Sequence, residues 1–319
     1  MAAAKTGTSF AAATAVKALS SHEYEALFVD DWCIGSVPHG GYVTAIFIQV
    51  ASKHFSTTLS SQNQPHTIAL HLDFLRRTSE GPAIFTVKDT KLGRQASVVH
   101  ITLSQGSRTE VIGSITQGNI TAEDGVTFTT NYSLHPAPLP VNLSLLAKDE
   151  DEHWTRSPEM PFAAFRKATR KTMFHFPREG QRKRSTADEW VKLSTGEKWT
   201  NASIGYLSDM WPMPVEAFIA KVNLYDVKNQ KVGKEALRPA RFWYPTLLLN
   251  LDMKKSLPEE GVEWLFVRVD SKQIKNGRLD LEVVIMDEGG DIVALSHHVA
   301  FALPAERNLA ARRTGASKI

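Results

Sequence analysis

The chain has 319 residues, of which 42% are hydrophobic and 22% charged, a balance typical of a soluble globular protein with a substantial core. Its net charge of +3 is too small to indicate a nucleic-acid partner or an anionic membrane surface. The single cysteine, Cys33, excludes an intrachain disulfide, and no apolar run approaches the ~20 residues that span a bilayer. We therefore expect neither nucleic-acid binding nor a membrane span.

The N-terminal part predicts one buried helix followed by an antiparallel sheet. Residues 23–29 alternate like a half-buried strand, and residues 42–52 are apolar almost all round, as in a buried helix. Gly40 and Gly41 stand at the entrance of this helix, where another backbone or a ligand can approach closely. Strand-like segments follow at residues 66–75, 83–90, 96–104 and 110–118. Together these elements predict a compact unit whose sheet wraps around the helix.

The same pattern recurs in the C-terminal half. Residues 188–193 predict a strand, the segment around Asp209 leads into a second helix, and strands follow near 244–253, 263–270, 278–286 and 291–303. Residues 67–74 also align without gaps with residues 246–253. We therefore predict a duplicated α+β unit. Its parts are residues 1–120, a connector at 121–185, a second unit at 186–305 and a tail at 306–319.

The connector is marked by its composition. It contains a stiff proline-rich stretch at residues 136–140 and an acidic run at 149–152. A basic run extends from Arg166 to Arg184, which we interpret as a solvated face or loop rather than a nucleic-acid signal.

Two prolines draw attention to the segment around Asp209. Proline is accepted in the first turn of a helix and excluded from its interior, so Pro212 and Pro214 predict a helix start at about residues 212–214. Asp209 then lies just before the positive end of that helix, where a carboxylate stays ionised and can orient water. The alternative is that Asp209 only caps the helix.

Five motifs occur in a fixed order along the chain. They are Trp32 with His39-Gly40-Gly41-Tyr42, His71-Leu72-Asp73-Phe74-Leu75-Arg76-Arg77, Leu92-Gly93-Arg94, Ser208-Asp209 and Tyr244-Pro245-Thr246. This ordered set resembles the acyl-CoA thioesterase II family and its fungal thioesterase-like relatives. The resemblance covers most of residues 22–118 and 186–303 and implies a double hotdog fold, with two long helices each wrapped by an antiparallel β-sheet.

The resemblance also implies the catalytic residues. In that family an Asp, a Thr and a Gln bind the hydrolytic water, and these positions fall on Asp209, Thr246 and His298. A histidine therefore replaces the family's glutamine; it can still form hydrogen bonds and could act as a base near neutral pH, or it could be structural. We expect His39, Gly40, Gly41 and Trp211 to contact the substrate, with the Gly40 and Gly41 N–H groups stabilising an oxyanion. The candidates for binding CoA phosphates are Arg76, Arg77, Arg94, Lys254 and Arg278.

The implied activity is hydrolysis of an acyl thioester, either an acyl-CoA or an acyl-carrier thioester, without a cofactor or metal. The sequence contains neither Gly-x-Ser-x-Gly nor His-Glu-x-x-His. Three alternatives stay open. One is a hotdog hydratase or dehydratase, although Pro214 stands where those enzymes have a histidine, five residues after the Asp. The others are an acyl-releasing, acyl-transferring or cyclising enzyme of a secondary-metabolite pathway, and a catalytically silent acyl-binding module. A monomer and a homo-oligomer formed through the hotdog sheets are both compatible with the sequence.

The last three residues, Ser317-Lys318-Ile319, nearly match the Ser-Lys-Leu peroxisomal address. We expect a peroxisomal location, and a cytoplasmic one if this signal is not read.

Overall fold

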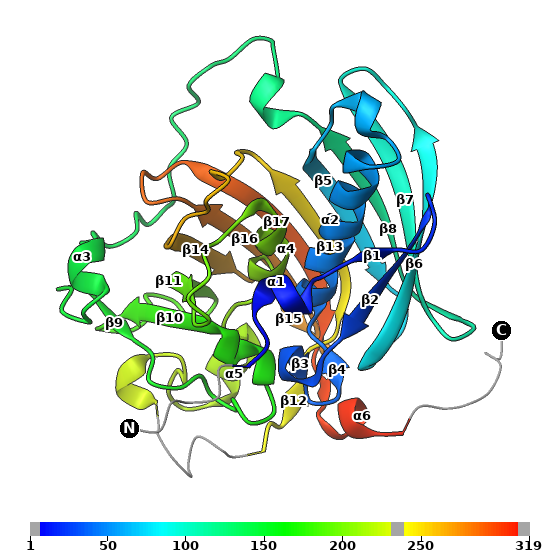
Figure 1. The fold of residues 1–319 in the computed structure, drawn as a ribbon. Coiled ribbons are helices and arrows are strands. Elements are labelled where there is room, and N and C mark those ends of the chain that lie inside the picture. Colours follow the sequence, from blue (N-terminus) through cyan, green and yellow to red (C-terminus); the bar gives the residue numbers. More distant parts are fainter. Residues whose placement is uncertain (1–6, 231–238, 312–319) are drawn as a thin grey trace.

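The computed structural model describes residues 7–230 and 239–311, so the predicted peroxisomal signal at 317–319 lies outside the described residues. The N-terminal half forms a long helix and a curved sheet (Figure 1). Its elements are α1 (Phe10–Ala13), β1 (Lys17–Ala18), β2 (Glu23–Phe28), β3 (Cys33–Ile34), β4 (Val37–Pro38), α2 (Gly40–Ser56), β5 (His66–Phe74), β6 (Gly81–Lys91), β7 (Ala96–Gln105) and β8 (Arg108–Gly118).

The middle and C-terminal parts supply further strands and shorter helices. They are α3 (Leu143–Leu146), β9 (Trp154–Arg156), β10 (Thr172–Pro177), β11 (Thr186–Leu193), α4 (Asn201–Leu207), α5 (Pro214–Ile219), β12 (Phe242–Trp243), β13 (Thr246–Met253), β14 (Leu265–Asp270), β15 (Ile274–Lys275), β16 (Arg278–Met286), β17 (Ile292–Phe301), β18 (Leu303–Pro304) and α6 (Glu306–Leu309). The strands predicted on both sides of the connector are thus confirmed within a few residues.

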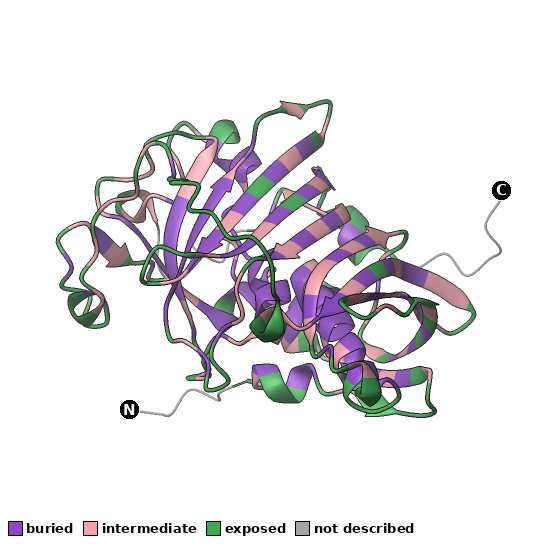
Figure 2. Cartoon of the chain, turned by 90° about the horizontal axis from the view of Figure 1, so that it is seen from above, coloured by how far each residue is buried: buried purple, intermediate pink, exposed green. Residues whose placement is uncertain are grey.

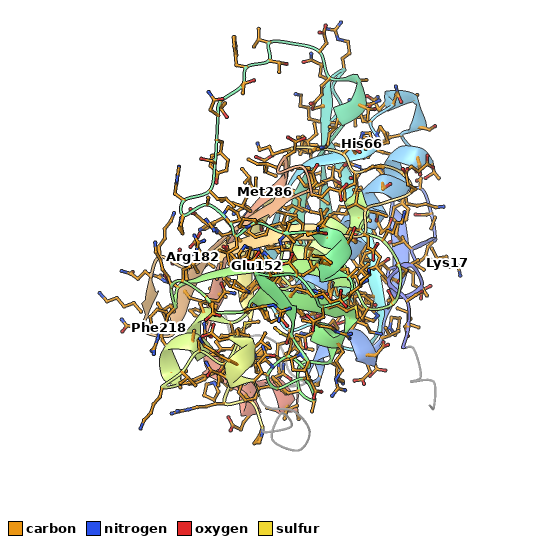
Figure 3. All side chains as sticks on the ribbon, turned by 90° about the vertical axis from the view of Figure 1, so that its left-hand side faces the viewer. Lys17, His66, Glu152, Arg182, Phe218 and Met286 are labelled. Carbon is orange, nitrogen blue, oxygen red and sulfur yellow. The ribbon has the colours of Figure 1, made fainter. Side chains whose placement is uncertain are left out.

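A single antiparallel sheet runs through both halves. Its strand order is β1-β2-β6-β7-β8-β5-β13-β17-β16-β14-β11-β10-β9, with β15 paired to β16. Lys17, in β1, and Arg182, which follows β10, lie toward opposite edges of the molecule (Figure 3). Along the strands, buried side chains alternate with exposed or half-buried ones, as expected for a sheet with one face packed on a core (Figure 2).

The two halves meet at β5 and β13, the strands that contain the matching sequences. His71 pairs with Asn250, and the equivalent pairs Leu70–Leu251 and Leu72–Leu249 lie on either side. Both strands also carry a bulge at the corresponding place, after Thr67 in β5 and after Thr246 in β13. The two predicted copies are therefore related by an approximate twofold axis, which passes through the His71–Asn250 pair.

The first half contains the long buried helix that the sequence predicts. Helix α2 has 17 residues and lies in the concave face of the N-terminal strands (Figure 1). Twelve of those residues are buried, since the helix packs on the sheet with one side and on α4 with another. Because apolar side chains lie on most sides of α2, the helix can be buried against both the sheet and α4.

The second half differs from the prediction of another long helix. Its counterpart of α2 is α4, which has seven residues and ends at Leu207, followed by a turn and by the six-residue α5 that begins at Pro214. The predicted helix start at 212–214 is confirmed for α5. A helix as long as α2 starting at Asn201 would carry Pro212 and Pro214 in its interior, where proline removes a backbone hydrogen bond and clashes with the preceding turn.

The proline-rich connector region also contributes to the sheet. Strands β9 and β10 extend it beyond β11. Part of the region also covers the outer face of the C-terminal strands, where a second apolar cluster forms. This cluster comprises Leu134, Leu146, Trp154, Trp190, Trp264, Phe266 and Met286. In the part of the chain that the structure describes, no helix is both long and apolar enough to cross a membrane.

Candidate active site

Asp209 lies in the turn that follows α4, next to the first turn of α2 from the other half. Its side chain is 5% exposed. The carboxylate Oδ2 accepts the backbone N–H of Gly41 at 2.8 Å, and Oδ1 accepts the hydroxyl of Thr246 at 3.3 Å. Asp209 therefore occupies a helix N-terminus as predicted, but the helix is α2 and not the one that follows it in sequence. The structure is compatible with both interpretations of Asp209, as a water-orienting carboxylate and as a helix cap, because its carboxylate also accepts an otherwise unpaired N–H at the end of α2.

The two glycines of α2 make this approach possible. A Cβ atom at Gly40 would lie 2.6 Å from Asp209 Oδ2, and one at Gly41 would lie 2.5 Å from the carbonyl oxygen of Tyr206. The expected close approach of another backbone is thus confirmed. The expectation that Gly41 donates to an oxyanion is wrong for this arrangement, since its N–H already donates to Asp209.

His39 holds the backbone of the same turn. Its Nε2 donates to the carbonyl oxygen of Asp209 at 3.0 Å and lies 3.5 Å from Oδ2 of that residue. Burial lowers the pKa of His39 to about 4, so the ring is neutral at physiological pH. With the single proton on Nε2, the buried Nδ1 is an acceptor, and it has no hydrogen-bond partner among the described residues.

His298 lies behind Asp209 on strand β17. The hydroxyl of Ser296 donates to the carbonyl of Asn250 at 2.7 Å and lies 2.8 Å from His298 Nε2. The other nitrogen, Nδ1, lies 3.5 Å from Asp209 Oδ1. Burial lowers the pKa of His298 to about 3, so the ring is neutral near pH 7 and would be a weak base. The adjacent His297 is exposed, as expected for neighbours on a strand.

The charge state of Asp209 also differs from the sequence-based expectation of a permanently ionised carboxylate. Burial raises the pKa of Asp209 from 3.8 to about 7, even though the hydrogen bonds from Gly41 and Thr246 act in the opposite direction. A carboxyl group with a pKa near the working pH is suited to accept and return a proton. The position is typical of a general base, because it combines burial, a defined geometry and a shifted pKa.

A cavity of about 730 Å³ opens in front of Asp209. The predicted site residues Asp209, Thr246, His39, Gly40 and Trp211 all line it, whereas, among the described residues, His298 and Gly41 do not. Most of the remaining wall is apolar or aromatic: Ile34, Val37, Phe74, Leu75, Met213, Phe242, Trp243, Leu247, Phe301 and Leu303. The size and lining are those of a site for a small molecule with a large apolar part.

Trp211 is positioned between the cavity and His298. Its ring meets the His298 ring edge to face, with the centroids 6.1 Å apart. The indole Nε1 is buried and makes no hydrogen bond to any described residue. An unpaired buried donor on a residue that lines the cavity is available to a ligand oxygen.

Arg166 is a cavity residue that the sequence analysis missed. It belongs to the basic run that we interpreted as solvated, but its side chain is only 3% exposed. The guanidinium donates to Glu216 at 2.9 Å and to the hydroxyl of Tyr225 at 3.1 Å, and Tyr244 donates to the same carboxylate oxygen of Glu216 at 2.9 Å. Lys171 of the same run is also buried and pairs with Asp31, whereas Arg170 is exposed. No local pattern separates these residues, since the partners of Arg166 come from residues 50 to 78 positions later.

The cationic candidates for phosphate binding separate into two groups. Arg76 and Arg77 line the cavity together with Arg307, whereas Arg94, Lys254 and Arg278 are not among its lining residues in the described part of the chain. Arg77 donates to the carbonyl oxygen of Asn308 at 2.8 Å and so ties α6 to the cavity rim. Cys33 is buried, and burial raises the pKa of its thiol to about 12, so the reactive thiolate form is disfavoured.

Comparison with known proteins gives the family. A family model described as the acyl-CoA thioesterase N-terminal domain matches residues 28–118, and one described as the acyl-CoA thioesterase C-terminal domain matches residues 139–302. The chain is 37% identical over 339 aligned residues to the thioesterase-like protein TwmA of Talaromyces wortmannii, and the match covers 97% of this chain and 96% of that one.

Solved structures share the fold. A thioesterase II from Thermobifida fusca, itself described as putative, superposes with a TM-score of 0.69 at 20% identity, covering 93% of this chain and 98% of that chain. A protein of unknown function with a hot dog fold from Alicyclobacillus acidocaldarius also gives a TM-score of 0.69, at 14% identity, covering 92% and 97% of the two chains. This chain therefore belongs to the acyl-CoA thioesterase family of double hotdog proteins, as shown by the two matching family models, the 37% identical relative and the shared architecture.

Proposed function

We propose that this protein hydrolyses an acyl thioester, with acyl-CoA as the substrate class. One observation carries the proposal: the carboxyl group of Asp209, with its pKa raised to about 7, shares the wall of a large apolar cavity with the Thr246 hydroxyl that donates to it. In the ionised form, Asp209 accepts a proton from a water molecule that Thr246 Oγ1 helps to hold. The resulting oxygen nucleophile attacks the thioester carbonyl carbon.

The tetrahedral intermediate needs donors for its oxyanion. The Gly41 N–H is already used by Asp209, so the proposal assigns this role to the buried Nε1–H of Trp211 and to the positive N-terminus of α2 beside Gly40. When the intermediate collapses, the carbon–sulfur bond breaks and the proton held by Asp209 passes to the leaving thiolate. The products are a carboxylic acid and a free thiol, and Asp209 is ionised again.

The cavity fits the two ends of an acyl-CoA. The apolar wall accommodates the acyl chain, and each buried CH₂ group contributes about 0.8 kcal/mol to binding. Arg76, which is exposed at the rim, and Arg307 supply positive charge for the CoA phosphates. The substrate therefore enters with its acyl chain first, and its thioester stops beside Asp209.

The test is a panel of acyl-CoAs of increasing chain length, with free thiol followed over time for the wild-type protein and for Asp209→Asn. We expect release of CoA by the wild type and a 10²–10⁴-fold lower rate for the variant. Binding without thiol release would instead identify an acyl-binding module. A change in double-bond absorbance without thiol release would identify a hydratase or dehydratase.

We also propose a peroxisomal location, which rests on the sequence Ser317-Lys318-Ile319 alone. A fluorescent protein fused to the N-terminus of the full chain should enter peroxisomes, and removal of these three residues should leave the fusion in the cytosol. Equal distribution of both fusions would contradict the proposal.

A further inference from the structure

Two histidines and an aspartate meet at the end of α2 that is remote from the cavity. His54 lies in the last turn of α2, His22 directly precedes β2, and Asp89 lies on β6. One ligand atom from each, the two histidine nitrogens and a carboxylate oxygen, lie within 4.8 Å of one another. His54 Nε2 is 2.9 Å from Asp89 Oδ1, and His22 Nε2 is 3.3 Å from Asp89 Oδ2.

A single residue, Ser21, holds the rear of both imidazole rings. Its hydroxyl oxygen lies 2.8 Å from His22 Nδ1, and its carbonyl oxygen lies 3.1 Å from His54 Nδ1. Such contacts fix which nitrogen carries the proton and how the ring is oriented. Both rings therefore present Nε2 to the same carboxylate.

Tyr24 also contacts the rear of the His54 ring. Its hydroxyl oxygen lies 2.9 Å from His54 Nδ1 and 3.1 Å from the Ser21 carbonyl oxygen. The Nδ1 side of this buried ring is therefore occupied by protein groups, and Nε2 is the nitrogen that lies beside Asp89, at 2.9 Å from Oδ1.

We propose that His22, His54 and Asp89 form a binding site for a first-row transition-metal dication, with Zn²⁺ as the representative ion. Two imidazole nitrogens and one carboxylate oxygen suit such ions better than Mg²⁺ or Ca²⁺, which prefer oxygen ligands alone. In a tetrahedral zinc site with ligands at about 2.0–2.1 Å, neighbouring ligand atoms are about 3.3 Å apart. His54 and His22 approach different oxygens of Asp89, at 2.9 and 3.3 Å, and the three ligand atoms lie within 4.8 Å of one another, so small side-chain rotations would bring them to that spacing. Water would complete the coordination from the exposed side of His22.

The site is structural rather than catalytic. His54 lies 14 residues after Gly40 on the same helix, which corresponds to about 21 Å along the axis. The ion would join the end of α2, the start of β2 and strand β6, three elements that are not adjacent in the chain. Because residues 22, 54 and 89 are so far apart in the chain, no short metal motif signals this site.

The experiment uses the full chain without a histidine tag, stripped of metal with a chelator and then titrated with Zn²⁺ by calorimetry. One ion per chain is expected. At a free Zn²⁺ concentration of 100 times the dissociation constant, the folding equilibrium constant should rise about 100-fold. Co²⁺ in place of Zn²⁺ should give visible absorption bands of a four-coordinate nitrogen–oxygen site.

Two variants locate the site. His22→Ala removes a half-exposed ligand, and Asp89→Asn keeps the shape of the side chain while removing its charge. Both should lose the Zn²⁺-dependent stabilisation and the Co²⁺ bands. The matched control is His71→Ala, since His71 also lies beside an aspartate, Asp73, at 3.3 Å but without a second histidine. That variant should bind Zn²⁺ like the wild type. Absence of Zn²⁺ binding by the wild type, or unchanged binding by His22→Ala and Asp89→Asn, would overturn the proposal.

Discussion

The approximate twofold axis relates the candidate active site to a second pocket at the other end of the helix pair. Counted from the helix starts at Gly40 and Asn201, the position of Asp209 corresponds to Ile48. The second pocket is lined by Ile48 and Thr67, together with Asn201 and Ala202 at the start of α4. These residues correspond one by one to Asp209, Thr246, Gly40 and Gly41.

The strand behind each pocket completes the comparison. Leu249 pairs with His298 in one half, and its counterpart Leu70 pairs with Ile115 in the other. The Asp–His pair of the candidate active site is therefore an Ile–Ile pair in the second pocket, while the threonine is present in both. The cavity volumes are about 730 and 60 Å³. Both halves thus keep the same scaffold, but among the described residues the buried carboxyl group and the larger cavity lie at the Asp209 end of the helix pair.

The largest expected effect comes from the one acidic residue in this comparison. Asp209→Asn should lower kcat/KM for an acyl-CoA by 10²–10⁴-fold, because it removes the base and preserves the shape of the side chain. The matched substitution in the second pocket is Ile48→Val, which should lower the free energy of unfolding by about 0.5–1.5 kcal/mol and leave kcat/KM unchanged. Thiol release measures both. Wild-type activity in Asp209→Asn would show that the two pockets do not differ catalytically in this way.

The dependence of kcat/KM on pH should report the ionisation of Asp209, the carboxyl group that the second pocket lacks among its described residues. Only the ionised form of Asp209 can accept a proton, so kcat/KM should rise about tenfold per pH unit below pH 7 and level off above it. An acidic limb centred near pH 4 would mean that a solvent-exposed carboxylate, and not buried Asp209, is the base.

Stability should change with pH in the opposite direction to activity. Because the folded protein holds the Asp209 proton more tightly than the unfolded chain does, this group favours folding fully below pH 4, and the benefit is lost as pH rises to about 7. The shift of about three pKa units corresponds to at most about 4 kcal/mol. Asp209→Asn should therefore be more stable than the wild type at pH 8 by a few kcal/mol and by less at pH 5, as measured by urea unfolding. A gain that does not depend on pH would contradict this account.

The two threonines offer a matched pair of substitutions. Thr246→Val removes a hydroxyl that donates to the carboxylate, and a hydrogen bond to a charged group is worth about 1.5–3 kcal/mol, so kcat/KM should fall about 10–100-fold. The hydroxyl of Thr67 is buried and has no hydrogen-bond partner in the described residues. Thr67→Val should consequently keep full activity and equal or higher stability. Similar losses in both variants would mean that the pockets act together.

The smallest effect is expected from a substitution of His298, which lies behind the Asp209 carboxylate. His298→Gln restores the residue that the family's pattern has at this position, and the glutamine amide can donate a hydrogen bond to Asp209 Oδ1. Such a bond stabilises the ionised form, so the acidic limb of the pH–rate profile should move to lower pH by up to about one unit. A shift to higher pH would show that His298 is itself a donor to Asp209.

Periodicity and repeated sequence were sufficient to predict most of the fold. Alternating strands, an all-apolar helix and the match of residues 67–74 with 246–253 led to the duplicated α+β unit. The prolines at 212 and 214 correctly indicated a helix start, but they also end α4 early, and sequence alone did not show which helix would face Asp209. The contact between Asp209 and Gly41 joins residues 168 positions apart, so it depends on the packing of α2 against α4.

The parts of the site that sequence missed all depend on distant partners. Arg166 resembles any other residue of a basic run until Glu216 and Tyr225 surround it. The charge states of Asp209 and His298 are set by burial, which a local pattern of polar residues does not reveal. Thr246 and Asp209, by contrast, were correctly placed together through the resemblance to a family.

The pairing of β5 with β13 inside one chain has a consequence for how such a protein can evolve. In an assembly of two identical subunits, every substitution appears twice, so an aspartate gained at one pocket is gained at both. Here the two halves are encoded separately, and Ile48 can differ from Asp209. Because the Gly41 N–H from one half meets the Asp209 carboxylate from the other along a single polypeptide, dilution cannot separate them. Activity per molecule should therefore stay constant down to the lowest concentrations that an assay can measure.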